Sequence, residues 1–172
     1  MKFLNLIKEC IPDYAKDIRL NIDGTIARSS LVGNDAVGVT LATAFAAKNK
    51  VIIDIIKASG ALAPEEMTAA LTASALMGMN NIWYPFVEMA DDADMKTQTA
   101  QLRMNPYATN GGVDKRRFEM YALAASFVGK CHFFVKSHFE LLKKERMSTV
   151  QLRDVCRIAA VINAAAQVIA AE

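Results

Sequence analysis

The chain has 172 residues, a net charge of +2 and an apolar fraction of 53%. Its length favours one domain with a substantial core, and its composition leaves little of it to be disordered. The small net charge excludes the strongly basic face that nucleic-acid-binding proteins present, so we expect no nucleic acid as a partner.

Signals for export or membrane insertion are not expected in this sequence. The opening MKFLNLIKEC is too short and too interrupted by charge to be the apolar region of a secretory signal. The most apolar stretch, residues 69–90, contains two asparagines and a proline, so no segment is expected to span a membrane. Three cysteines, an odd number, indicate a reducing compartment, so we expect a cytoplasmic protein. Cys10 and Cys156 have no polar neighbours in sequence and are expected to be buried.

Nearly every segment has a helical pattern, which predicts an all-α fold. Residues 50–57, KVIIDIIK, are β-branched enough for a strand, but no second strand accompanies them, so a helix is expected. Pro64, followed by two glutamates, predicts a helix start. A further helix is expected from about Asp114, after the glycine pair at 111–112. Ser148, in the capping box STVQ, predicts the last helix, which should run to about residue 170.

An internal repeat divides the chain. Residues 41–56 align with 123–138 at a shift of 82, and residues 63–79 align with 148–164 at a shift of 85. We interpret these as two copies of one helical hairpin, at about 41–81 and 123–166. Coincidence, or patterning shared by all helical bundles, is the alternative. The identities that carry the first alignment are Leu41, Ala42, Phe45 and Lys48 with Leu123, Ala124, Phe127 and Lys130.

The stretch GKCHFFVKSH, residues 129–138, is the candidate site. In the first copy Asn49 and Ile56 stand where the second has Cys131 and His138, so packing alone does not require the thiol or the imidazole. Gly129 predicts the end of one helix and the start of another near Cys131. A thiol at a helix N-terminus has a lowered pKa and is more nucleophilic.

Helical geometry places three side chains of this stretch on one face. At about 100° per residue, Phe134 lies about 60° from Cys131, and His138 lies about 20° from it on the other side. His138 could then exchange protons with the thiol. His132 points about 100° away and is expected to be a surface or interface side chain.

Glu119, twelve residues before Cys131, has two interpretations. If its helix is buried, it is a carboxyl group with a raised pKa and a candidate proton carrier. Alternatively, it is an exposed residue of the first helical turn. One cysteine and two histidines do not complete a zinc site, so no metal is expected. A phosphate-binding glycine loop and a GxSxG motif are absent from the sequence.

Taken together, these segments resemble the AhpD alkylhydroperoxidases of the carboxymuconolactone decarboxylase-like superfamily. The resemblance covers nearly the whole chain as one AhpD-like domain, residues 1–172. It is carried by FEMYALAASFVGKC before the candidate site, and by three further segments: IPDYAKDIRLNI (11–22), MGMNNIWY (77–84) and LRMN (102–105).

The resemblance implies an all-α homotrimer with a duplicated helical core. It also implies an antioxidant enzyme that reduces peroxides weakly through a redox-active cysteine pair. No bound cofactor is implied. Electrons would come from the lipoyl group of a dihydrolipoyl acyltransferase and pass to the peroxiredoxin AhpC.

By position, the resemblance makes Glu119 the proton-relay carboxylate, Cys131 the cysteine that pairs with partners, and His138 the family histidine. The second cysteine, which attacks peroxide in the family, should stand at 134, where this chain has Phe134. Phenylalanine in place of this cysteine removes the attacking thiolate and the partner for an internal disulfide, so we expect impaired activity. Phenylalanine is also larger and could crowd the site.

Two other residues depart from expectation. Arg146 stands where a helix–helix turn usually has a left-handed glycine, and Cys156 interrupts a face of small and apolar residues. With Phe134 they suggest a second interpretation, a catalytically disabled and engineered AhpD homotrimer used as a scaffold or designed assembly. A third and weaker interpretation is a decarboxylase, by kinship within the superfamily.

Overall fold

The computed structural model describes residues 1–103 and 112–172, and its helices confirm the all-α expectation. No strand occurs in these two segments. Met104, Asn105 and Gly111, which belong to motifs noted above, lie outside the described residues. The α-helices are α1 (Lys2–Glu9), α2 (Lys16–Ile22), α3 (Gly33–Ala46), α4 (Lys50–Ala58), α5 (Pro64–Ala90), α6 (Ala93–Thr97), α7 (Lys115–Val128), α8 (His132–Lys144) and α9 (Thr149–Ala171). Asp13–Ala15 forms a 3₁₀ turn and Asp23–Ala27 a π-helical turn.

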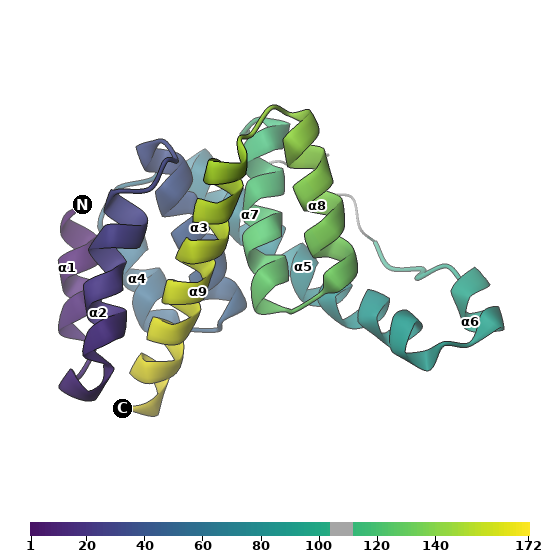
Figure 1. Ribbon diagram of the computed structural model, residues 1–172, viewed down its shortest axis with the longest axis horizontal. Coiled ribbons are helices and arrows are strands. Elements are labelled where there is room, and N and C mark those ends of the chain that lie inside the picture. The colour runs from purple at the N-terminus through teal and green to yellow at the C-terminus, as the bar shows by residue number, and fades with distance from the viewer. Residues whose placement is uncertain (104–111) are drawn as a thin grey trace.

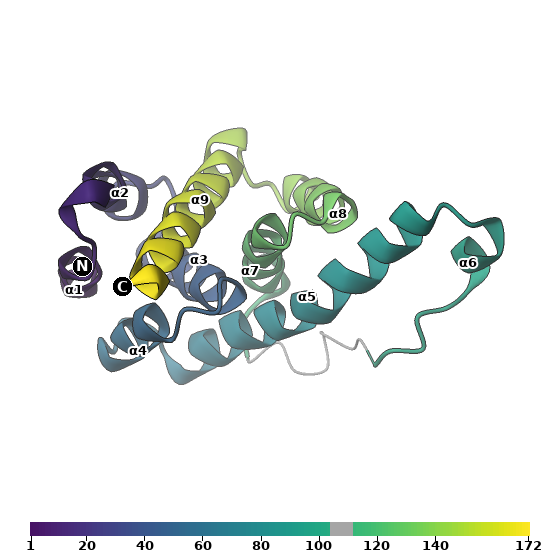
Figure 2. The same cartoon turned by 90° about the horizontal axis from the view of Figure 1, so that it is seen from below.

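Helix α3 lies at the centre of the molecule and packs against α5, α7 and α9. It is buried nearly all round because small residues such as Ala36 and Ala42 let its neighbours approach closely. Gly38 is required at this contact, since an added Cβ would lie 2.4 Å from the ring of Tyr121 on α7. Figures 1 and 2 show α1 and α2 at one end, beside the end of α9, while the second half of α5 projects away from the body with α6.

The two proposed repeat copies have matching helix boundaries. Helix α7 begins and ends 82 residues after α3, α8 begins 82 residues after α4, and α9 begins 85 residues after α5. The turn residues Lys48 and Lys130 both have positive φ, at 58° and 53°. The duplication stays a prediction, which these matched positions support.

The predicted helix ends fall where local chemistry supplies caps. Residues 50–57 are helical, as predicted, because the Asn49 side chain accepts a hydrogen bond from the Ile52 N–H at the start of α4. The capping box at Ser148 and Gln151 is confirmed at the start of α9. Arg146 has φ 65°, so it occupies the left-handed position at which a glycine was expected.

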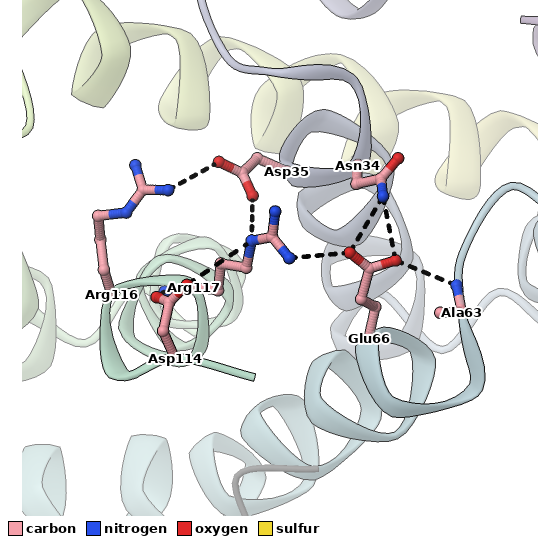
Figure 3. A network of polar contacts seen from close by, with 7 residues as sticks. All are labelled: Asn34, Asp35, Ala63, Glu66, Asp114, Arg116 and Arg117. Carbon is pink, nitrogen blue, oxygen red and sulfur yellow. Dashed lines mark hydrogen bonds and ion pairs between the residues drawn. The ribbon is translucent and has the colours of Figure 1, made fainter. Parts of the chain in front are cut away.

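A buried ionic network joins the first turns of α3, α5 and α7 (Figure 3). The Arg117 guanidinium lies 2.8 Å from Asp35 and 2.9 Å from Glu66, and Arg116 contacts Asp35 at 3.3 Å. Burial raises the pKa of Asp35, and the two arginines beside it oppose this shift without cancelling it. Glu66 also accepts the Ala63 N–H at 3.0 Å and thereby caps α5.

Two expectations about packing were wrong. Cys156 is exposed, because α9 turns Val155 and not its neighbour toward the core, and Cys10 is only half-buried.

Helix α9 has the length and the apolar composition of a helix that could cross a membrane, although no membrane-spanning segment was expected from the sequence. A core helix passes the same test, and α9 packs its buried side chains against α3 and α7.

Candidate active site

The turn between α7 and α8 places Cys131 at the start of a helix, as predicted. Gly129 ends α7 with φ −73°, so the left-handed residue of the turn is Lys130, not the glycine. Gly129 is needed for another reason, because an added Cβ would lie 2.1 Å from the side-chain nitrogen of Asn81 on α5. Cys131 is the N-cap residue of α8, and its backbone N–H donates to the Ser126 carbonyl at 3.2 Å.

The Cys131 side chain is enclosed by the fold, at 0% exposure. Within the two described segments, no hydrogen bond joins its thiol to His138. A thiol that exchanges disulfides with a partner must be accessible to it. Any such exchange at Cys131 therefore requires the α7–α8 turn to open.

Glu119 and His138 form a buried pair. Glu119 Oε2 lies 2.5 Å from His138 Nδ1, and the two residues are 2% and 8% exposed. Of the two interpretations of Glu119, the buried carboxyl group is therefore correct. With Glu119 on the Nδ1 side, proton exchange at the other ring nitrogen, Nε2, would require its contact with Met77 to break. Nε2 faces the sulfur of Met77 on α5 at 3.4 Å.

Of the face predicted for Cys131, Phe134 and His138, the part shared by Phe134 and His138 is confirmed, because Phe134 covers the imidazole. The two rings stack with centroids 5.4 Å apart and an interplanar angle of 27°. Tyr84 of α5 meets the edge of Phe134 at 4.7 Å and stacks on Phe133 at the same separation. The phenylalanine is thus held by rings on both sides, at the position where the resemblance led us to expect a second cysteine.

The structure adds α5 residues that the sequence reasoning did not assign to the site. Met77 and Tyr84 stand seven residues apart, which puts both on one face of α5. Their motif, MGMNNIWY, contributed only to the family resemblance, although that spacing was a usable signal. His132 is exposed, as expected. Among residues 1–103 and 112–172, no group of three or more His, Cys, Asp or Glu side chains could hold a metal ion.

Comparisons with known proteins identify the family of this chain. Residues 93–172 match the model of the carboxymuconolactone decarboxylase family. The alkyl hydroperoxide reductase AhpD of Rhodospirillum centenum is 42% identical over 98% of this chain and 91% of its own length. The AhpD of Maricaulis maris is 40% identical over 98% of this chain and 98% of its own length. The AhpD of Coxiella burnetii is 39% identical over 96% of this chain and 96% of its own length. The chain therefore belongs to the AhpD family of alkyl hydroperoxide reductases.

Proposed function

We propose that the chain is a thiol-dependent alkyl hydroperoxide reductase whose turnover is impaired by Phe134. The observation that carries this proposal is the buried pair of Glu119 and His138, at 2.5 Å, in a protein about 40% identical to AhpD reductases. Thiol peroxidase chemistry needs a group that takes the thiol proton and returns one to the leaving alkoxide. In this proposal His138 has that role, and Glu119 orients the ring.

The proposal predicts that the chain as it stands turns over peroxide at close to the uncatalysed rate. Cys131 lacks a second thiol with which to close a catalytic cycle, and it is fully buried. The measurement is consumption of an organic hydroperoxide with dihydrolipoamide as the reductant, beside a blank without protein. A rate several orders of magnitude above the blank would contradict the assignment of position 134 as the missing attacking thiol.

The electron partners come from the family resemblance. In a form with cysteine at 134, a lipoyl group on a dihydrolipoyl acyltransferase would reduce the disulfide of the site, and the peroxiredoxin AhpC would receive the electrons, in the cytoplasm. The odd number of cysteines in the sequence favours a reducing compartment. The glutamate–histidine pair supports proton transfer during thiol–disulfide exchange, in which a thiolate attacks and another leaves.

We also propose that the protein is a homotrimer. An apolar stripe of exposed side chains runs along α5 on the side away from its buried face, formed by Met79, Ile82, Phe86 and Met89. A contiguous exposed apolar surface of this kind usually lies at an interface.

Particle mass tests both the trimer and the scaffold interpretation. Light scattering is expected to give three times the chain mass of 18.8 kDa. A large closed particle would favour the interpretation of the chain as a catalytically disabled, designed assembly. Phe134 and the exposed Cys156 are consistent with that interpretation. A monomer at micromolar concentration would contradict both, while Cys156→Ser, which removes the exposed thiol, serves as a control against artefactual disulfide links.

A further inference from the structure

A side chain of α5 holds the turn that precedes Cys131. The Asn81 amide donates a hydrogen bond from Nδ2 to the Ala125 carbonyl, at 3.2 Å, and this carbonyl also accepts the Gly129 N–H at the end of α7. The same side chain lies against the backbone of Gly129, where an added Cβ would be 2.1 Å from Nδ2. Asn81 therefore fixes the end of α7 to α5, next to the residue pair that leads to the buried thiol.

The matching turn between α3 and α4 shows that Gly129 serves Asn81 and not the backbone of its own turn. Both turns have the same three hydrogen bonds, donated by the N–H groups of residues 47–49 in the first turn and 129–131 in the second. The first turn has Ala47 at the position of Gly129, with nearly the same φ, −77° against −73°. The backbone of such a turn therefore accepts alanine, and the glycine leaves room for the amide from α5.

The two turns are tied to the rest of the fold by amides that reach in opposite directions. In the first turn, the Asn49 side chain donates to the Ala166 carbonyl of α9 at 2.9 Å. In the second turn Cys131 takes the place of Asn49, and the donor is Asn81, which matches Ala166 at the shift of 85. Where a thiol occupies the turn, the amide thus comes from the facing helix, so the tie does not use the residue that would react.

The surroundings of Asn81 allow this tie to be released. Asn81 Oδ1 is buried and has no hydrogen-bond partner among the described residues. An unpaired buried acceptor is costly, so the closed turn is less stable than a fully bonded one would be. A cavity of about 480 Å³ lies beside the amide, between the α3–α4 turn, α5 and the end of α7. Its wall includes Gly78, which leaves space on α5 into which the Asn81 side chain can turn away from Gly129.

We propose that Asn81 is a positioning residue that holds the α7–α8 turn closed over Cys131, and that its release gives the thiol access to the disulfide of a partner. The thiol is fully buried in the closed turn, and exchange requires its sulfur to approach the disulfide directly. A local opening breaks a few hydrogen bonds and leaves the rest of the fold intact. Its use in turnover rests on the proposed function, but access to the thiol is measured without peroxide. A protein without turnover whose Cys131 access depends on Asn81 would contradict the proposed function and not this inference.

The test measures how fast Cys131 reacts with dithiobis(nitrobenzoate) when Cys10→Ser and Cys156→Ser leave it as the only thiol. The Cys131 thiolate attacks the disulfide of the reagent, forms a mixed disulfide and releases one coloured thiolate, which is followed by its absorbance. Asn81→Ala is expected to raise this rate on the order of 10-fold, the effect of one lost hydrogen bond on the opening equilibrium. The rate should depend only weakly on urea below the unfolding transition, since a local opening exposes little surface.

Asn49→Ala is the matched control for a general loss of stability. It removes the amide that ties the first turn, so it should lower the urea midpoint of unfolding. It should leave the rate at which Cys131 reacts in the absence of urea unchanged, because the second turn keeps its own amide.

Gly129→Ala acts on the same tie from the other side, and it keeps the proposal testable if Asn81→Ala fails to fold. The added Cβ displaces the amide and should raise the rate by a similar factor. Where both variants fold, the double variant should react no faster than either alone, because both remove one contact. The proposal is overturned if Asn81→Ala or Gly129→Ala reacts at the background rate, or if the faster reaction increases with urea as steeply as global unfolding.

Discussion

Replacing Phe134 with cysteine is expected to raise hydroperoxide turnover by at least about 100-fold, the range that positioned thiol and acid–base chemistry supplies. The introduced thiolate would take the distal oxygen of the peroxide, and the alkoxide would leave as an alcohol after receiving a proton from His138. Cys131, three residues earlier, would then attack the resulting sulfenic acid and release water with formation of a disulfide. Dihydrolipoamide would reduce that disulfide and complete the cycle.

The exchange also removes the ring that stacks on His138, so the imidazole becomes accessible from the same side as the new thiol. The measurements are the rate of organic hydroperoxide loss and the number of free thiols after one equivalent of peroxide, which should fall by two. Phe133→Cys is the matched control, since it adds a thiol about 100° away on the same helix and should not restore turnover. Equal rates for the unaltered chain and Phe134→Cys would show that residue 134 is not the missing redox position.

Local sequence signals predicted the helices around the site, because the start and end of each helix depend on residues that are close in sequence. The Asn49 cap helps to explain why residues 50–57, which are rich in β-branched side chains, form a helix and not a strand. The extent of α5 was not predicted. Its pattern was recognised over residues 63–79, yet it continues through Pro85 to Ala90, although Pro85 has no backbone N–H to donate within the helix.

The chemistry of the site depends partly on long-range contacts, which cannot be predicted from the spacing of residues in the sequence. The face shared by Phe134 and His138 followed from 100° per residue and is confirmed. Burial decided between the two interpretations of Glu119, and burial comes from the packing of α5, α7 and α8 together. Met77 contacts His138 across 61 residues of sequence, so this contact could not be derived from local pattern. The exposure of Cys156 was likewise set by the rotation of α9.

Replacing Arg117 with alanine is expected to lower the free energy of unfolding by about 3–5 kcal/mol at pH 8, the usual cost of breaking a buried ion pair. The change leaves Asp35, whose side chain is 2% exposed, and Glu66 without their shared guanidinium. The pKa of Asp35 is already raised by burial in the intact protein, and the loss of Arg117 should raise it further.

The sign of the pH dependence follows from that shift. With a pKa higher in the folded protein than in the unfolded chain, Asp35 takes up a proton on folding as the pH falls. The destabilisation of Arg117→Ala should therefore be smaller at pH 5 than at pH 8. The measurement is urea unfolding at both pH values and at one protein concentration, because assembly would also contribute to stability.

A control variant distinguishes the effect of breaking this buried network from the effect of breaking an ordinary surface ion pair. Lys50→Ala removes an exposed ion pair with Asp54 and should cost less than about 0.5 kcal/mol at either pH. If Arg117→Ala is destabilised equally at pH 5 and pH 8, its effect comes from lost packing of the arginine side chain and not from buried carboxylates. A pH-dependent loss would instead show that Arg117 is the cation that allows α3, α5 and α7 to bury acidic side chains where they meet (Figure 3).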